Sequence, residues 1–286
     1  MSEIKIAVIG LGLIGGSILK ALKEKDYYLI GVSRSQDTID KVKNENLANE
    51  ASTNLEIVAN ADIVFVCTPI NKTIDIVEKV SQIVSKQCII TDVASLKGFI
   101  MDHFRANEEK INFIGGHPMA GTENKGIDAA QNGLFEDAKW VLTPAEWSWN
   151  KDIQKLKKVI EDMGAKVIIA DPYEHDKATA LISHMPMLIS QALFGMVNSY
   201  PEKNIRDLAL KLASSGFRDM TRLACSNPEM ANDMLSLNSK NIDTALNKVF
   251  EYAQKLKADF NINDEKFLKD FEQTINARKA MYNSNG

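Results

Sequence analysis

The chain has 286 residues, 45% hydrophobic and 25% charged, a composition typical of globular proteins with room for two modest domains. Its net charge of -4, with both signs interspersed, argues against nucleic acid or a membrane surface as a partner. No apolar stretch approaches the roughly 20 residues that span a bilayer, and the three cysteines lack disulfide or metal-ligand spacing. We therefore expect a cytoplasmic protein that acts on a small molecule and holds no metal.

The first part of the chain alternates short β-branched runs with amphipathic segments, a pattern that predicts parallel β units. The expected strands are 4–9, 28–32, 63–67, 88–92, a segment around Phe113, 140–142 and 166–169. The expected helices are 15–23, 37–46, 71–85, 96–106 and 152–164. Together they predict an α/β fold over residues 1–170, with one doubly wound, mostly parallel sheet of the Rossmann type.

The strand pattern stops near Asp171, and amphipathic helices follow to the end of the chain. Residues 171–286 are therefore predicted to form an all-α domain. Two expected helices, 242–260 and 265–281, carry apolar stripes that could be buried within one chain or against a second subunit. We expect a homodimer that forms through this domain.

A Gly-x-Gly-x-x-Gly motif directly follows the first strand and opens the first helix. The first glycine permits a tight turn, the second lets the backbone approach a pyrophosphate, and the third lets helix and strand pack closely. The alternative is a Gly-rich turn in another kind of α/β protein, but the strand and helix on either side favour a dinucleotide. The predicted cofactor loop consists of Gly10, Leu11, Gly12, Leu13, Ile14 and Gly15.

The end of the second strand bears on the choice of cofactor. It reads Ser33-Arg34, without the Asp or Glu that NAD-preferring sites usually place there. Ser33 and Arg34 could bind a 2′-phosphate, which favours NADP. Alternatively, Arg34 is only solvated and Asp37 reaches the ribose, so NAD remains possible.

Further ligand contacts are expected at the carboxyl ends of the next two strands, where open α/β sheets bind their ligands. Cys67, Thr68 and Pro69 are predicted to line the cofactor. Asp92 and Ser95 could face the nicotinamide or the reacting carbon. Either segment could also be an ordinary turn.

The four histidines are candidate bases, because removing a hydride from an alcohol carbon requires a group that takes the hydroxyl proton. His103 is expected on the surface of a helix. His117 is the strongest candidate and is expected on a constrained loop at a strand end, although such a histidine can equally be structural. His175 and His184 are expected on the first helix of the second domain, where Pro186 must kink or open the helix.

Arg218 and Arg222 are four residues apart and share one face if their segment is helical. Such a face can bind carboxylates through bidentate hydrogen bonds. The alternative is a salt-bridged surface turn.

Seven segments of the chain resemble the prephenate/arogenate dehydrogenase family of tyrosine biosynthesis: GLGLIGGS, VSRS, VCTPI, TDVASLKG, GGHPMAGTENKGIDAA, SHMPM and ASSGFRDMTRLACSNPEM. The resemblance covers nearly the whole chain, and HPMAGTE followed by SHxP and SGFRDxTR is far more specific than the glycine motif. The VSRS segment is similar to the NADP-using, arogenate-preferring cyanobacterial members. Two alternatives are less favoured. The β-hydroxyacid dehydrogenases and imine reductases share a Rossmann domain followed by helices but lack HPMAGTE. A non-enzymatic dinucleotide sensor would need neither a base such as His117 nor a carboxylate-binding residue such as Arg222.

The resemblance implies an oxidative decarboxylation of prephenate or arogenate with hydride transfer to the nicotinamide. By motif match, His117 would be the base on the C4 hydroxyl of the substrate ring, Ser95 would assist at the same oxygen, and Arg222 would hold the ring carboxylate. The rest of the substrate pocket would be lined by His184, Arg218 and Thr122.

One residue departs from the family pattern. Many members carry a tryptophan where this chain has Ala231, after Pro-x-Met. The departure leaves the choice between prephenate and arogenate open, since these substrates differ only in a keto or amino group.

Overall fold

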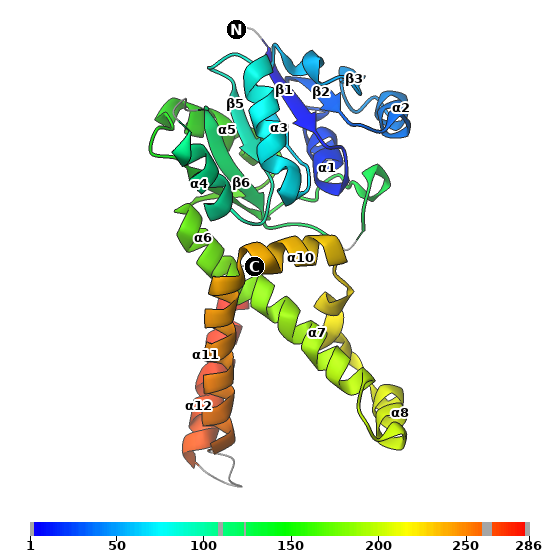
Figure 1. Cartoon of the computed structure of the whole chain (residues 1–286), viewed down its shortest axis with the longest axis vertical. Helices are drawn as coiled ribbons and strands as arrows, with labels where there is room; N and C mark the ends of the chain where they lie inside the picture. The colour runs from blue at the N-terminus through cyan, green and yellow to red at the C-terminus, as the bar shows by residue number, and fades with distance from the viewer. Residues whose placement is uncertain (1–2, 108–110, 123, 259–264, 284–286) are drawn as a thin grey trace.

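The computed structural model describes residues 3–107, 111–122, 124–258 and 265–283. Figure 1 shows a layered α/β half that contains the N-terminus and an extended set of helices below it. The predicted fold class, a Rossmann-type mostly parallel sheet followed by an all-α part, is confirmed. Glu123 of the HPMAGTE segment and the predicted helix end at Phe260 lie outside the described residues.

An eight-stranded sheet forms the centre of the α/β half, in the order β3-β2-β1-β4-β5-β6-β7-β8. Its strands are β1 (Ile4–Ile9), β2 (Tyr27–Val32), β3 (Glu50–Ser52), β4 (Ile63–Val66), β5 (Ile89–Asp92), β6 (Phe113–Pro118), β7 (Lys139–Pro144) and β8 (Lys166–Ile169). All neighbours are parallel except β6 and β7. Among the described residues of the connection between these two strands, the structure has the short turn η2 (Ile127–Ala129) and no crossover helix, which allows the antiparallel pairing.

The edge strand β3 was missed by the sequence analysis. It has only three residues, and Ala51 is the one that is buried, so the segment carries too little hydrophobic periodicity to be recognised.

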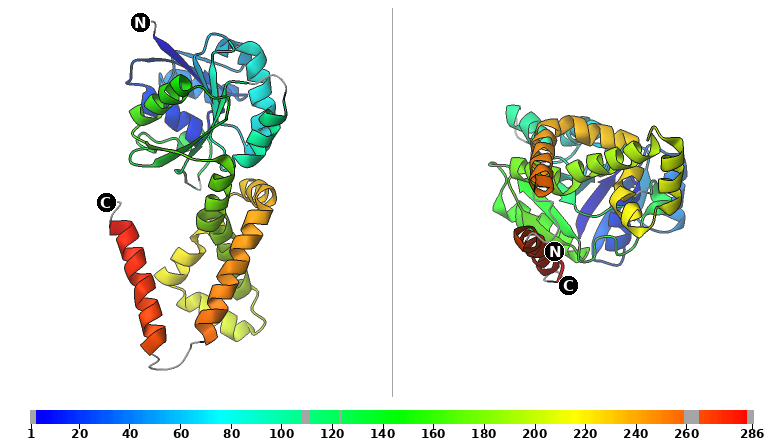
Figure 2. Two further views of the ribbon diagram at one scale, coloured as in Figure 1. Left: turned by 90° about the vertical axis from the view of Figure 1, so that its left-hand side faces the viewer. Right: turned by 90° about the horizontal axis from the view of Figure 1, so that it is seen from below.

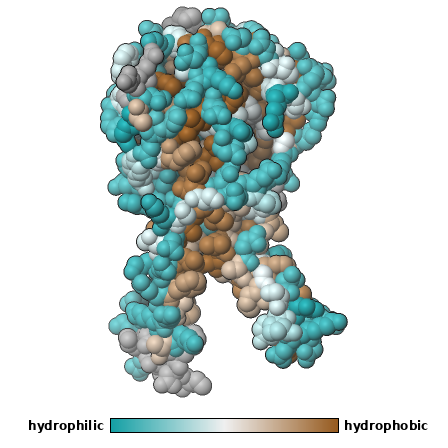
Figure 3. All heavy atoms as spheres, in the orientation of Figure 1, coloured by the Kyte–Doolittle hydropathy of each residue, from teal (hydrophilic) through white to brown (hydrophobic). Residues whose placement is uncertain are grey.

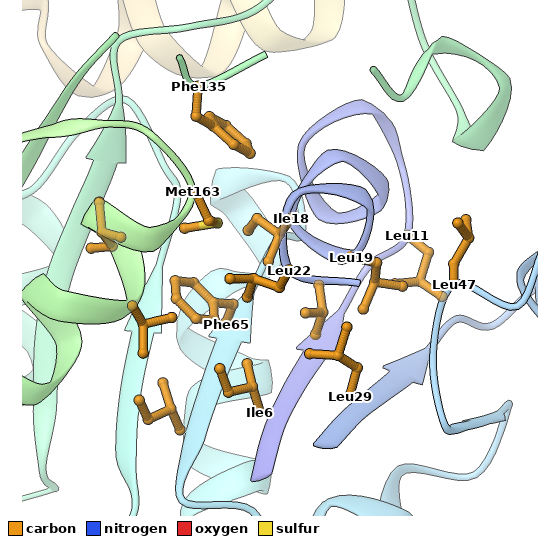
Figure 4. Close-up of a cluster of buried hydrophobic side chains, with 14 of the residues drawn as sticks. Ile6, Leu11, Ile18, Leu19, Leu22, Leu29, Leu47, Phe65, Phe135 and Met163 are labelled. Carbon is orange, nitrogen blue, oxygen red and sulfur yellow. The ribbon is translucent and has the colours of Figure 1, made fainter. Parts of the chain in front are cut away.

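Helices cover both faces of the sheet, as expected for a doubly wound fold. They are α1 (Leu13–Leu22), α2 (Gln36–Asn44), α3 (Ile70–Ile83), α4 (Gly98–Ala106) and α5 (Asn150–Asp162), with a short turn η1 (Leu55–Val58). On one face Ile18 and Leu22 of α1 pack near Phe65 of β4 (Figure 4). On the other face Val77 of α3 and Phe104 of α4 lie in a second cluster. Each such side chain contributes roughly 1.5–3 kcal/mol when fully buried.

The helical half begins at Asp171, whose carboxylate accepts the backbone N–H groups of Tyr173 and Glu174 at 2.9 and 3.0 Å and so caps the first helix. The elements are α6 (Pro172–Thr179), a π-helical turn η3 (Ala180–His184), α7 (Met185–Asn198), α8 (Lys203–Leu212), α9 (Ser215–Thr221), a 3-10 turn η4 (Arg222–Cys225), α10 (Pro228–Leu237), α11 (Ser239–Ala258) and α12 (Glu265–Asn283). The turn η3 ends just before Pro186, which confirms the expected irregularity there.

The helical half leaves much of its apolar surface exposed. Among its described residues, the buried hydrophobic cluster consists of Ala180, Met185, Ile242 and Ala245. Figure 3 shows an apolar patch directly below the α/β half, over the helices. In Figure 2, α12 stands apart from the other helices, and no described residue of α12 is buried. Within one chain, the described parts of these helices bury few apolar side chains against one another.

One helical stretch corrects the expectation that no segment is long and apolar enough to span a bilayer. The continuous run Pro172–Asn198 meets both criteria, with a mean hydropathy of 1.5 over its best window. It also carries His175, Asp176 and His184, all buried against protein. Length and hydropathy alone are therefore weak evidence for a membrane span here.

Candidate active site

The predicted ligand-binding segments meet at the carboxyl edge of the sheet. The last residues of β1, β4 and β5 lie side by side, because Ile9 pairs with Val66 and Val66 pairs with Asp92. The glycine loop, the segment after Val66 and the segment after Asp92 therefore emerge next to one another. This is the edge at which open α/β sheets bind ligands.

The glycine loop has the geometry of a dinucleotide cradle. Gly10 has a φ of +92°, and a Cβ there would lie 2.6 Å from the carbonyl oxygen of Cys67. A Cβ on Gly15 would lie 2.1 Å from the carbonyl oxygen of Gly10, whereas one on Gly12 would meet nothing within 4 Å. Gly12 also precedes α1 without a side-chain cap in the described structure. This open backbone at a helix N-terminus fits a pyrophosphate.

Leu11 is buried in the core, so only its backbone could contact a cofactor. Leu13 and Ile14 form the first turn of α1, where backbone N–H groups have no partner within the helix. The loop would accordingly hold a phosphate through its main chain.

The residues that bear on NADP or NAD lie where they were expected. Strand β2 ends at Val32, and Ser33 and Arg34 follow it directly. The Ser33 hydroxyl accepts the backbone N–H of Ser35 at 3.3 Å, and both Arg34 and Asp37 are exposed. The preference for NADP stays a prediction.

The segment after β4 borders the glycine loop. The backbone N–H of Cys67 donates to the carbonyl of Ile9 at 2.7 Å, and Pro69 caps α3. Burial raises the pKa of the Cys67 thiol, which therefore stays neutral. The hydroxyl oxygen of Thr68 is buried with no hydrogen-bond partner among the described residues. An unpartnered buried hydroxyl beside the cradle supports a ligand contact at Thr68.

A buried ion pair, which the sequence analysis missed, fixes the segment after β5. Lys97 Nζ contacts an Asp92 carboxylate oxygen and donates to the carbonyl of Gly116 at 2.7 Å. The other Asp92 oxygen accepts the N–H of Gly116 at 3.0 Å. Burial lowers the pKa of Lys97, an effect that the neighbouring Asp92 opposes. The Asp92 carboxylate is already engaged by protein donors, and its predicted contact with the cofactor remains untested.

His117 lies within strand β6 and not on a loop, which corrects the sequence analysis. It pairs with Val141, because β7 extends the sheet as far as Pro118. The neighbouring position 116 must be a glycine, because a Cβ there would lie 2.5 Å from the carbonyl oxygen of Asp92. The strand therefore holds the His117 backbone more rigidly than a loop would.

The side chain of His117 begins a hydrogen-bonded series. Its Nδ1 lies 2.8 Å from Nε2 of His175, and Nδ1 of His175 lies 2.8 Å from Oδ1 of Asp176. His175 was expected on this helix but was given no role, and Asp176 was overlooked. The sequence did offer one indication of this role, because His175 and Asp176 are adjacent in the first helix after the sheet.

The environment of His117 keeps its ring neutral. Burial lowers its pKa well below the ordinary value, and the nearby His175, Lys97 and His184 add to the effect. A neutral imidazole at neutral pH can accept a proton.

His184 is buried close to this group. Its Nδ1 lies 3.0 Å from Nδ2 of Asn238, which also donates to the carbonyl of Asp176 at 2.8 Å. The Asn238 carbonyl oxygen accepts from Asn241 at 2.8 Å, which defines the orientation of the amide. Burial lowers the pKa of His184 to about 4.

The other predicted catalytic and substrate-binding residues make no hydrogen bond to the group around His117 in the described structure. Ser95 is half-buried, whereas Thr122 is exposed and accepts the N–H of Asn124 at 3.3 Å. Arg218 lies in α9, exposed, with its Nε 3.2 Å from a carboxylate oxygen of Asp219. Arg222, also exposed, begins the 3-10 turn that follows. The single chain thus leaves the predicted carboxylate-binding residues on its surface.

The fold and the site define the class of protein. A glycine cradle at the start of α1 and a neutral histidine on β6 lie at the same carboxyl edge of a Rossmann-type sheet, with β4 and β5 between their strands. A site that binds a dinucleotide and a group that accepts a proton are the two features that a nicotinamide-dependent dehydrogenase requires.

Comparison with known proteins makes the assignment more specific. The nucleotide-binding domain of prephenate dehydrogenase matches residues 18–169, and the prephenate dehydrogenase dimerization domain matches residues 171–277. A prephenate dehydrogenase of Bacillus subtilis (strain 168) is 30% identical over 293 aligned residues, which cover 98% of this chain and 78% of that protein. The chain belongs to the prephenate dehydrogenase family.

Solved structures agree with this membership. The crystal structure of Synechocystis arogenate dehydrogenase matches with a TM-score of 0.84 at 36% identity, covering 98% of this chain and 100% of that one. The A. aeolicus prephenate dehydrogenase, in complex with hydroxyphenyl propionate and NAD+, matches with a TM-score of 0.89 at 27% identity, covering 98% and 99%.

Proposed function

We propose that this protein catalyses the NAD(P)-dependent oxidative decarboxylation of prephenate to 4-hydroxyphenylpyruvate, or of arogenate to tyrosine, in tyrosine biosynthesis. The observation that carries the proposal is the neutral His117 at the same carboxyl edge of the sheet as the glycine cradle, in a chain of the prephenate dehydrogenase family. A base and a hydride acceptor are the two groups that oxidation of the ring alcohol requires.

His117 would take the proton of the C4 hydroxyl, with Ser95 assisting at the same oxygen. A bound oxidised nicotinamide would supply the hydride acceptor. As the bond between the ring and its carboxylate breaks, the bonding electrons enter the ring, which becomes aromatic, and carbon dioxide leaves. The residues that would hold the cofactor are those of the glycine loop together with Ser33, Arg34, Cys67, Thr68, Pro69 and Asp92.

Arg222 would bind the ring carboxylate, with His184, Arg218 and Thr122 around the rest of the substrate. Its role would be to position that carboxylate, because a tight buried pair would overstabilise the group that has to leave. Among the cofactors, NADP is proposed over NAD, on the strength of Ser33 and Arg34 at the end of β2.

The protein is further proposed to be a cytoplasmic homodimer, with a dinucleotide-binding domain at 1–170 and a helical substrate and dimerisation domain at 171–286. Support comes from the match to a dimerization domain and from the exposed apolar side chains of the helices. A second copy could cover these side chains, as in obligate homodimers.

The deciding experiment measures initial rates by the absorbance of the reduced nicotinamide, with prephenate and arogenate each combined with NAD and NADP. We expect turnover in at least one combination, and the fastest one identifies substrate and cofactor. Cofactor binding without turnover in all four would refute the proposal.

A further inference from the structure

The buried contacts around His117 determine where its proton sits. Two nitrogens 2.8 Å apart, such as His117 Nδ1 and His175 Nε2, share one proton, which one nitrogen donates and the other accepts. The same holds for His175 Nδ1 and the carboxylate of Asp176. The position of one proton therefore fixes the position of the next.

Asp176 sets the direction of this series. Its two carboxylate oxygens also accept the backbone N–H groups of Lys97 and Gly98, each at 2.8 Å. A carboxylate that already receives two N–H groups acts as an acceptor. The proton of the third contact accordingly belongs to Nδ1 of His175.

A neutral imidazole that carries its proton on Nδ1 has an unprotonated Nε2. His175 Nε2 therefore accepts, and His117 Nδ1 donates. The other ring nitrogen of His117, Nε2, keeps its lone pair.

We propose that His175 and Asp176 are positioning residues that hold His117 in the tautomer with its proton on Nδ1, so that Nε2 is the nitrogen that takes the substrate proton. The inference rests on the proposed role of His117 as the base. In the proton transfer, the O–H bond of the substrate alcohol breaks and an N–H bond forms at Nε2. The resulting imidazolium keeps its hydrogen bond to His175, and His175 keeps its own to Asp176.

The positioning pair belongs to the other half of the molecule. His117 lies on β6 of the sheet, whereas His175 and Asp176 lie on α6, at the start of the helical half. Docking of α6 onto the Lys97–Gly98 turn thus sets the protonation of a residue in the α/β half. A correct tautomer requires both halves in place.

The tautomers can be observed directly, because the chain has only four histidines. Long-range proton–nitrogen correlation spectra of protein labelled with 15N-histidine distinguish the two forms, and single His→Gln variants assign the signals. We expect His117 and His175 protonated on Nδ1. His184 should be protonated on Nε2, because its Nδ1 faces an Asn238 amide that already donates to Asp176. A His117 protonated on Nε2, which a doubly protonated His175 would impose, overturns the proposal.

Kinetics of two matched variants test the role in the reaction. In His175→Gln, an amide oxygen can still accept the proton of His117 Nδ1, whereas the side chain in His175→Leu fills space but accepts nothing. We expect kcat to fall about 10- to 100-fold in the leucine variant and only a few-fold in the glutamine variant, with the KM for the cofactor unchanged in both. Equal losses in the two variants would show that His175 only fills space.

The two tests also separate this inference from the proposed function. A wild-type protein that turns over neither substrate would refute the proposed function, while the spectra would still report the proton position. An active wild type with the other tautomer would refute the inference alone.

Discussion

The two halves of this molecule differ in how completely one chain can build them. In the α/β half, both faces of the sheet are covered, and side chains such as Phe65 and Phe104 are fully buried. In the helical half, side chains such as Ile182, Leu212 and Met220 are between 61% and 70% exposed. An apolar surface of this kind normally marks an interaction site.

The candidate site divides along the same line. Its proton-accepting end, from His117 to Asp176, is already joined by hydrogen bonds within one chain, although α6 of the helical half contributes to it. Its carboxylate-binding end, Arg218 and Arg222, is exposed. Folding of one chain therefore brings together the partners of His117 but leaves both arginines on the surface, where a second copy could complete that end of the site.

The largest expected effect comes from the buried end. His117→Asn should cut kcat by ~10²–10⁴-fold, because it removes the general base, while the cofactor Kd stays nearly unchanged. Steady-state kinetics and cofactor titration measure the two quantities. The matched control is His103→Asn, a change at a partly exposed histidine bonded to Glu78. Near-native turnover in His117→Asn would remove His117 from the mechanism.

The junction between the halves should lose stability in acid. Burial lowers the pKa of His184 to about 4 in the folded protein. As the pH falls below about 6.5, the unfolded chain therefore takes up a proton at this histidine while the folded protein does not. Its contribution is thus fully present above pH 6.5 and is lost as the pH falls toward 4, by about 2–3 kcal/mol at pH 4.5. Urea unfolding at pH 7 and pH 4.5 measures it, and the loss should shrink in His184→Gln but not in His103→Gln. An unchanged loss in His184→Gln would contradict the burial argument.

The exposed end should affect substrate binding alone. Arg222→Gln should raise the substrate KM roughly 10- to 100-fold, because a charge-assisted hydrogen bond contributes about 1.5–3 kcal/mol. The cofactor KM should not change. Arg206→Gln, in an exposed pair with Asp207, is the matched control. If both Michaelis constants rose equally, Arg222 would not be a carboxylate ligand.

The smallest effect concerns the rim of the cofactor site. Arg34→Gln should weaken NADP binding roughly tenfold and leave NAD binding unchanged, because only NADP carries the 2′-phosphate. Titration with both cofactors measures the ratio, and Lys43→Gln, a change farther along α2, serves as control. If the ratio of the NADP and NAD dissociation constants did not change, Asp37 would be favoured as the residue that contacts the ribose.

Features that depend on local pattern could be predicted from the amino-acid sequence alone. Alternating β-branched and amphipathic runs predicted seven of the eight strands, and the glycine motif predicted the position of the cradle. The irregular helix near Pro186 followed from a missing backbone N–H, which is again a local property.

Features that depend on contacts between distant residues followed from how the elements pack. The antiparallel pairing of β7 with β6 turned the expected loop at His117 into a strand. The approach of α6 brought His175 to His117, across 58 residues of sequence, and β6 brought the carbonyl of Gly116 to Lys97. Periodicity reports which face of an element is apolar, but the partner that a polar side chain meets is set by how the elements pack.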